Sequence, residues 1–312
     1  MELRRLTATG PQLGGDLAAV IDKWEADVLP SRGNARSERP QLERLRKRLG
    51  KLTTSMLAPT DVVAYRDARL REHASAGTVR AELNLLSVIL GHAISEWGVQ
   101  GLRNVVRDVR KPTLPPGRDR RVSELELQHL LAAARHAPAD RPHEAPARGL
   151  APLIVLAVET SMRLGELVGL HWDHVDLKHR TAHLPNTKNG HARTVALSSR
   201  ACKALDELAL DRRPDGKVFD WARSDSVSHP FRRCVDRAQA QYLKKCTEDG
   251  EQPDPKFLVN IRFHDLRHEA TTRLLEAGLS ISETASMTGH RSLAALQRYT
   301  HIEARKVAQK LG

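Results

Sequence analysis

The chain has 312 residues, and its 50 Lys and Arg residues against 38 Asp and Glu residues give a formal net charge of +12. This length predicts about two domains, and the excess of basic side chains favours a polyanionic partner. A hydrophobic fraction of 40% excludes a wholly disordered chain, and three widely spaced cysteines argue against a disulfide framework.

The first part of the chain is predicted to be helical. Apolar residues recur at helical spacing in four stretches, which predicts helices over residues 16–28, 42–49, 60–71 and 78–97. Together these helices predict a small, net basic domain over residues 1–110. Its densest basic run comprises Arg44, Arg46, Lys47, Arg48 and Lys51. The run is interpreted either as a solvated helix face or as a surface that contacts phosphates.

A proline-rich stretch, residues 111–121, separates this helical part from the rest of the chain. Proline fixes φ and lacks an N–H donor, so the stretch predicts an extended interdomain linker. Its three arginines, Arg118, Arg120 and Arg121, are further candidates for phosphate contacts.

The rest of the chain, residues 122–312, mixes helices with a few short strands. Ser123 and Glu126 form a capping-box pattern that predicts a helix to about His136, and a strongly apolar helix is predicted over residues 149–159. Strands are predicted over residues 172–177, 181–184 and 193–197, with a turn at residues 186–190. Further helices are predicted over residues 199–210, 226–244, 265–276, 281–288, 293–299 and 303–310.

Four clusters in this second part differ from ordinary packing sequence. The first runs from Thr160 to Glu166 around Arg163, and the second is Lys188 in the predicted turn. The third is His264-Asp265-Leu266-Arg267-His268, and the fourth is Gly289-His290-Arg291, followed nine residues after His290 by Tyr299. The ordered series Arg, Lys, His-x-x-Arg, His, Tyr resembles the tyrosine recombinases, or phage integrase family, over residues 121–312. One departure is Ser161, where the family often has glycine, so the turn before Arg163 is expected to differ in shape.

The resemblance implies a fold that is mainly α with a small antiparallel β-sheet. It implies an N-terminal helical core-binding (SAM-like) domain and a catalytic domain of the tyrosine-recombinase type. It also implies a site-specific DNA recombinase, which cleaves and rejoins DNA through a 3′-phosphotyrosine intermediate in inversion, integration or excision. The stretch from residue 289 to 301 resembles the shufflon-type and small phage-type members.

The resemblance assigns a role to each residue of the series. Arg163 and Arg267 would hold the non-bridging phosphate oxygens, since a guanidinium stays charged and presents a planar fork of donors. Tyr299 would be the nucleophile, and Lys188 the general acid for the departing 5′-oxygen. His264 and His290 would hydrogen-bond the scissile phosphate and shuttle protons. Glu166, one helical turn after Arg163, would support the site rather than perform chemistry.

The implied partners are double-stranded DNA recombination sites, bound by a homotetramer on synapsed DNA with a Holliday-junction intermediate. Rejoining would need no cofactor and no metal, because the phosphotyrosine bond conserves the energy of the phosphodiester. The basic residues of the 44–51 run and the linker would then contact DNA. No stretch approaches about 18 consecutive apolar residues and the N-terminus lacks a secretory pattern, so a cytoplasmic protein of a bacterium, phage or mobile element without a membrane partner is expected.

Alternatives stay open for several of these residues. Tyr299 is also compatible with core packing, and Arg163 and Glu166 with an ordinary surface pair. Lys188 has competitors in Lys178 and Arg193. His264 and His268 have the i,i+4 spacing of metal ligands, but the His-Glu-x-x-His pattern of a zinc protease is absent. At the level of function, the alternatives are a type IB topoisomerase-like DNA-relaxing enzyme and a catalytically inactive DNA-binding regulator.

Overall fold

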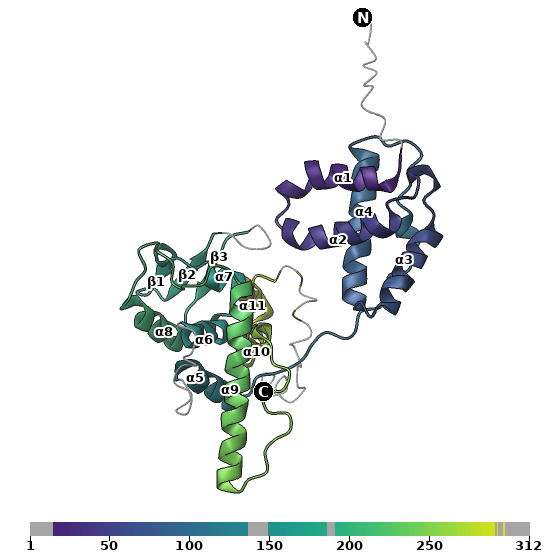
Figure 1. The fold of residues 1–312 in the computed structure, drawn as a ribbon. Coiled ribbons are helices and arrows are strands. Elements are labelled where there is room, and N and C mark those ends of the chain that lie inside the picture. Colours follow the sequence, from purple (N-terminus) through teal and green to yellow (C-terminus); the bar gives the residue numbers. More distant parts are fainter. Residues whose placement is uncertain (1–14, 137–148, 186–190, 291, 293–295, 297–312) are drawn as a thin grey trace, which may run out of the picture. The chain divides into compact units, whose positions relative to one another are not determined.

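The computed structural model describes residues 15–136, 149–185, 191–290, 292 and 296. The chain divides into two compact units, Met1–Gly117 and Arg118–Gly312 (Figure 1). Each unit has its own hydrophobic core. Residues 109–123 contain neither helix nor strand, as expected for a linker, but residues 118–121 belong to the second unit. No helix in the described part of the chain is long and apolar enough to cross a membrane.

The described part of the N-terminal unit, residues 15–117, contains four α-helices: α1 (Leu17–Asp27), α2 (Ala35–Leu49), α3 (Pro59–Arg71) and α4 (Ala76–Ser95). Side chains cap two of them, since Asp16 accepts a hydrogen bond from the Ala19 N–H and Ser75 accepts one from Thr78. α4 packs against the other three helices through a face rich in Leu, Ile and Val. Its apolar i, i+3, i+4 spacing is the reason that it buries this face.

Helix α2 begins seven residues earlier than the sequence predicted. The predicted helix started only after Pro40, whereas Pro40 lies inside the observed helix. A proline removes only one backbone hydrogen bond there, and the turn before it is held by an ion pair of 2.7 Å between Arg32 and the buried Glu38. Tertiary packing and this ion pair therefore outweigh the local proline signal.

The second unit surrounds the apolar helix α6 (Leu150–Thr160), in which nine of 11 residues are buried. Such a helix has no polar face and needs neighbours on all sides. α5 (Glu124–Arg135), α8 (Ser199–Ala209) and α10 (Phe263–Glu276) pack against it. The predicted capping box opens α5, because Glu126 N–H donates to Ser123 Oγ and Ser123 N–H donates to Glu126 Oε2. The other α-helices among the described residues of this unit are α7 (Leu164–Val168), α9 (Asp225–Asp249) and α11 (Ile281–Thr288).

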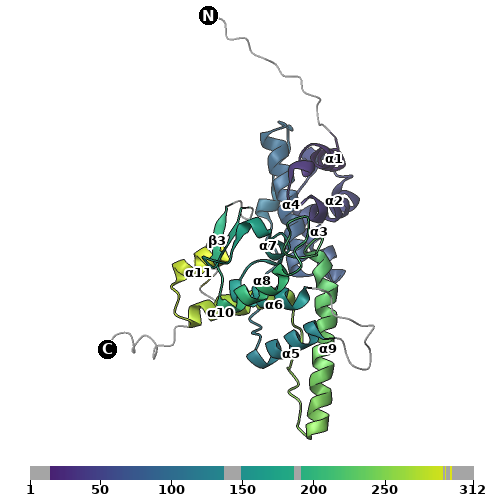
Figure 2. The same cartoon turned by 90° about the vertical axis from the view of Figure 1, so that its left-hand side faces the viewer.

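The small sheet has three antiparallel strands in the order β1 (Val175–Asp176), β2 (Thr181–Leu184), β3 (Arg193–Ala196). Its register pairs Val175 with Ala182, and Ala182 with Val195. α11 lies beside β3 (Figure 2), so the sheet edge approaches the helix that precedes Gly289. The predicted mainly α fold with a small antiparallel sheet is thereby confirmed.

The first predicted strand, residues 172–177, is largely wrong. Trp172–His174 form a 3₁₀ turn and only Val175–Asp176 are strand. The backbone at this point pairs with a segment outside the sheet, since Trp172 N–H donates to Gly216 O at 2.9 Å and His171 forms a β-bridge with Lys217. The predicted turn at 186–190 and the helices at 293–299 and 303–310 lie outside the described residues.

Candidate active site

The turn that carries Arg163 is fixed by an unusual residue, Ser161. It ends α6 with φ +54°, the left-handed conformation that glycine adopts without steric cost. Ser161 is fully buried, and its hydroxyl shares a hydrogen bond of 2.9 Å with the Thr271 hydroxyl of α10. The turn therefore keeps a glycine-like backbone, and the serine side chain ties it to α10.

Arg163 is held by the carboxylate of Glu166, one turn along α7. Glu166 accepts hydrogen bonds from the Arg163 backbone N–H at 2.8 Å and from Arg163 Nη1 at 2.9 Å. The same carboxylate accepts bonds of 2.8 and 2.6 Å from Arg193 of β3. Since the Glu166 side chain is only 5% exposed, the two residues are not an ordinary surface pair.

The electrostatics of Glu166 follow from this arrangement. Burial alone would raise the pKa of Glu166, but the hydrogen bonds and charges of Arg193 and Arg163 outweigh it and hold the pKa below its usual range. Glu166 is therefore ionised at neutral pH and locks two guanidinium groups in place. Its supporting role in the chemistry stays a prediction.

Arg267 of α10 joins three segments that are far apart in the sequence. Its side chain is buried, donates from Nη1 to the backbone carbonyl of Ser161, and donates from Nη2 to the carbonyl of Thr288 at 2.6 Å. Arg163 Nη2 reaches the carbonyl of the next residue, Gly289, at 3.5 Å. The two predicted phosphate-binding arginines thus converge on the C-terminal end of α11.

His290 lies at the same place. Gly289 ends α11 with φ +70°, and a Cβ atom there would lie 3.0 Å from Arg193 Nη1, so the close approach of Arg193 suits glycine. Directly after it, His290 Nδ1 and the Thr288 hydroxyl share a hydrogen bond of 2.6 Å. The glycine turn thereby sets His290 beside both arginines.

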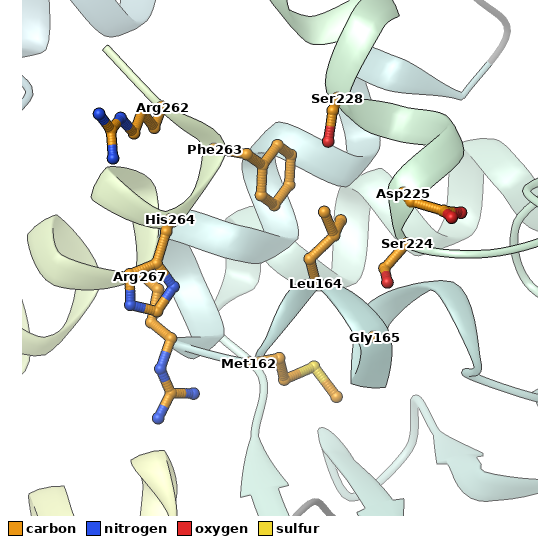
Figure 3. A pocket seen from close by; sticks show the side chains of 10 residues that line it. All are labelled: Met162, Leu164, Gly165, Ser224, Asp225, Ser228, Arg262, Phe263, His264 and Arg267. Atoms are coloured by element: carbon orange, nitrogen blue, oxygen red, sulfur yellow. The ribbon is translucent and has the colours of Figure 1, made fainter. Parts of the chain in front are cut away.

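His264 lines a cavity of about 410 Å³ that also contains Arg267. Figure 3 shows both side chains on one wall, with the apolar side chains of Met162, Leu164 and Phe263 nearby. The His264 and His268 rings meet edge to face, with centroids 4.7 Å apart. Among the described residues, no group of three or more His, Cys, Asp or Glu side chains is arranged to hold a metal ion.

Two predicted catalytic residues, Lys188 and Tyr299, lie outside the described residues. Of the competitors for the role of Lys188, Arg193 is committed to Glu166, and its side chain is only 10% exposed. It also donates from Nε to the carbonyl of Met287 at 3.0 Å. Arg193 thus holds Glu166 in place, whereas the sequence suggested it only as a competitor for the role of Lys188.

The basic run of the N-terminal unit is largely engaged in ion pairs within that unit. Arg44 contacts the fully buried Glu82 at 2.7 Å, and Glu82 also accepts bonds from Arg69 and Tyr65. Arg46 contacts Asp22 and Glu25, and Arg48 contacts Glu72. Lys47 and Lys51 are exposed and form no ion pair with a described residue. Phosphate binding by this run stays a prediction.

The three linker arginines lie against carboxylates of the second unit. Arg118 binds Asp265 at 2.8 Å, and Arg121 binds Glu269 at 2.7 Å, so both contact α10. Arg120 binds Glu126 of α5. Asp265, Glu269 and Glu126 are all buried, so these arginines neutralise interior charge. Their contact with DNA also stays a prediction.

Two guanidinium groups and two imidazoles, brought together from distant segments, define a site suited to a phosphate-bearing substrate. Residues 120–306 match the model of the phage integrase family. Over 265 residues, the chain is 37% identical to a shufflon-specific DNA recombinase of Escherichia coli, an alignment that covers 82% of this chain and 60% of that protein. The chain therefore belongs to the phage integrase family, and the resemblance drawn from the sequence is confirmed.

Solved structures share the fold. The Tn1549 transposon integrase, solved in complex with circular intermediate DNA, superposes with a TM-score of 0.70 over 96% of this chain and 99% of that one, at 17% identity. A lambda integrase tetramer bound to a Holliday junction gives a TM-score of 0.65 over 92% and 78% of the two chains, at 20% identity. The architecture is thus that of an integrase in both units.

Proposed function

We propose that this protein is a site-specific DNA recombinase that cleaves and rejoins double-stranded DNA through a covalent tyrosine intermediate. The observation that carries the proposal is the convergence of Arg163, Arg267 and His290 at the end of α11. These residues come from three separate segments, and ordinary packing does not require two buried or half-buried arginines at one helix end. Membership of the phage integrase family supplies the reaction class.

The reaction begins with attack of the Tyr299 oxygen on the scissile phosphorus, as the phenolic proton passes to His264 or His290. The new bond joins phosphorus to the tyrosine, and the bond to the 5′-oxygen breaks. Lys188 gives the departing oxygen its proton, which leaves a 3′-phosphotyrosine and a free 5′-hydroxyl. A 5′-hydroxyl then attacks the phosphotyrosine, which reverses each bond change and frees Tyr299. Bond energy is conserved, so neither step needs ATP.

The two arginines stabilise the negative charge that develops on the phosphate in the transition state. Arg163 and Arg267 hold the non-bridging oxygens, on which the transition state concentrates negative charge. Each contributes roughly 3–4 kcal/mol by comparison with oxyanion-hole donors. His264 and His290 donate hydrogen bonds to the same phosphate and pass protons near neutral pH.

The proposed assembly is a tetramer of this chain on two paired DNA sites. Strand exchange between two duplexes needs four cleaved strands and so four active sites, and the lambda integrase tetramer on a Holliday junction supports this stoichiometry. Residues 1–110 would be the core-binding domain, residues 111–121 the linker and residues 122–312 the catalytic domain. The proposed location of the activity is the cytoplasm of a bacterial host, where a DNA substrate is available.

The decisive experiment replaces the nucleophile. Tyr299→Phe is expected to bind DNA as the wild type does, but to form no covalent protein–DNA adduct on a nicked substrate made from the DNA that flanks its gene. The chain has only three tyrosines, so Tyr65→Phe and Tyr242→Phe serve as matched controls and should form the adduct. An adduct with Tyr299→Phe would refute the assignment of the nucleophile.

Other outcomes separate the alternatives. Relaxation of supercoiled DNA by monomers, without exchange between two sites, would identify a type IB topoisomerase-like enzyme instead. Sequence-specific binding with no adduct from the wild-type protein would identify an inactive DNA-binding regulator.

A further inference from the structure

Arg262 occupies a position that the local rules of helix formation assign to another kind of residue. It is the N-cap of α10, with φ −118° and ψ 154°, directly before Phe263. Ser, Thr, Asp and Asn are preferred there because their side-chain oxygen accepts a backbone hydrogen bond, whereas a guanidinium has no acceptor. The Arg262 side chain accordingly makes no capping bond. The helix thus forgoes one capping interaction at this position.

The catalytic unit uses the same device at Arg163. Arg163 is the N-cap of α7, and again its side chain makes no capping bond. In both helices the acid three residues later accepts the N-cap N–H: Glu166 at 2.8 Å from Arg163, and Asp265 at 2.8 Å from Arg262. Both cap arginines therefore stand at the start of a helix whose backbone geometry is secured by the following carboxylate.

The difference lies in what the two guanidinium groups contact. Arg163 shares Glu166 with Arg193, but Asp265 is already bound by both ends of the Arg118 fork. Arg262 is exposed and forms no ion pair with any residue that the structure describes. Most arginines that flank the site are paired with carboxylates. The Arg262 guanidinium is instead available to bind an anionic ligand.

The surroundings of Arg262 indicate what it binds. It lines the cavity of His264 and Arg267, and Figure 3 shows it on the same wall as these two residues, across from Ser228. It also lines a second cavity of about 620 Å³ between α9 and the segment before α10. Arg232 of α9, exposed and without an ion pair to a described residue, lines this second cavity together with the acid Asp236. Arg262 is thus at the junction of the two cavities.

We infer that Arg262 binds a DNA backbone phosphate next to the scissile one, so that the strand runs from the His264 cavity past Arg262. This inference rests on the proposed function. A guanidinium fork suits phosphate oxygens, and Arg262, which has no ion pair to a described residue and lines both cavities, can meet the strand without breaking such a pair. Arg262 is then a positioning residue, which sets the register of the strand and takes no part in the bond changes.

The test uses the fact that arginine is an unfavourable N-cap residue for α10. Arg262→Ser removes the charge and restores a favoured N-cap, so it is expected to melt at or above the wild-type temperature while it binds DNA less well. On a random-sequence DNA duplex we expect roughly tenfold weaker binding, the effect of one lost hydrogen-bonded charge. The slope of log affinity against log salt should fall in magnitude by about 0.9, the value for one phosphate contact.

Two further variants serve as controls. Arg262→Lys keeps the charge and loses the fork, so its salt slope should match the wild type although its affinity is lower. Arg233→Gln removes the same charge from an exposed position of α9 that lines neither cavity, and it should bind like the wild type.

Three results would overturn the inference: unchanged binding by Arg262→Ser, a loss confined to one base sequence, or a loss that parallels a lowered melting temperature. Failure of the proposed function looks different. It would appear as the absence of a covalent adduct from the wild-type protein, which this binding measurement does not use. A wild-type adduct combined with normal binding by Arg262→Ser would refute the role of Arg262 alone.

Discussion

Glu166 illustrates how a buried carboxylate prepares a cationic site. Two guanidinium groups at one place repel each other, and before a phosphate binds, its negative charge cannot offset that repulsion. Glu166 lies between Arg163 and Arg193 and is nearly inaccessible to solvent, so its charge acts in a medium that screens it weakly. The site is therefore preorganised before DNA arrives, which is the condition for electrostatic stabilisation of a transition state.

Glu166→Gln should reveal this role through its pH dependence. At pH 7 the variant should unfold more easily by about 3 kcal/mol, because two arginines lose a buried counter-charge. The pKa of Glu166 is lowered in the folded state, so the stabilisation is complete above its ordinary value of 4.5 and is lost as the pH falls through the lowered value. The gap between wild type and variant should therefore narrow below about pH 4.5.

Chemical denaturation across this pH range measures the gap. Glu248→Gln is the control, because Glu248 and Lys244 form an exposed pair and the change should have little effect at any pH. A gap for Glu166→Gln that stays constant down to pH 3, well below the ordinary glutamate pKa, would contradict the assigned charge.

Single residues also mark where the sequence sufficed and where it did not. Arg163, Arg267, His264 and His290 were predicted from motif spacing, and the fold brings them to one place; their chemical roles stay predictions. Arg193 carried no such signal, since its partner Glu166 is 27 residues away and the contact depends on how β3 meets α7. Local sequence also could not show that Ser161 would adopt the left-handed conformation, because this conformation is strained for a serine. The hydrogen bond to Thr271, which depends on the tertiary fold, offsets that strain.

At the scale of elements, α10 is held from outside by the segment that precedes α5. Asp265 and Glu269 lie four residues apart on α10, so they share one face, and Arg118 and Arg121 bind them. Burial alone would raise the pKa of Glu269, but the hydrogen bonds of Arg121 and Arg273 outweigh it and hold the pKa below its usual range. The helix that carries His264 and Arg267 is thus fixed by residues about 147 positions away.

Arg118→Gln should therefore disturb the catalytic helix. Asp265 would lose two charge-assisted bonds, at a cost of about 1–2 kcal/mol since Arg118 is partly exposed. That cost corresponds to a melting temperature lower by about 2–8 °C for a unit of this size, and adduct formation should slow. Arg223→Gln is the matched control because its partner Asp225 is exposed, and it should melt like the wild type. Equal melting of the two variants would show that the Arg118 contact does not hold α10.

The linker arginines also show why charge in a sequence overstates what is available to DNA. Six of the eight basic residues predicted to contact DNA form ion pairs inside their own unit: Arg44, Arg46, Arg48, Arg118, Arg120 and Arg121. Their partners lie between six and about 150 residues away, so spacing rules for neighbouring charges do not reveal them. Helix positions were predictable because periodicity is local, whereas the pairing of these charges is a property of the tertiary fold.

For the whole molecule, the ion pairs bear on where the catalytic unit begins. The sequence placed it at residue 122, after the last linker arginine, but the compact unit begins at Arg118.

A fragment of residues 118–312 is expected to melt in one cooperative transition. A fragment of residues 122–312 lacks three arginines and leaves Glu126, Asp265 and Glu269 buried with fewer counter-charges, so it should melt about 10 °C lower or more. A fragment of residues 112–312 should match the 118–312 fragment, because the added residues belong to the other unit. If all three melted alike, the arginines would be dispensable and the boundary at 122 would stand. If only the shortest melted early, these four linker residues would be part of the catalytic unit rather than of a free tether.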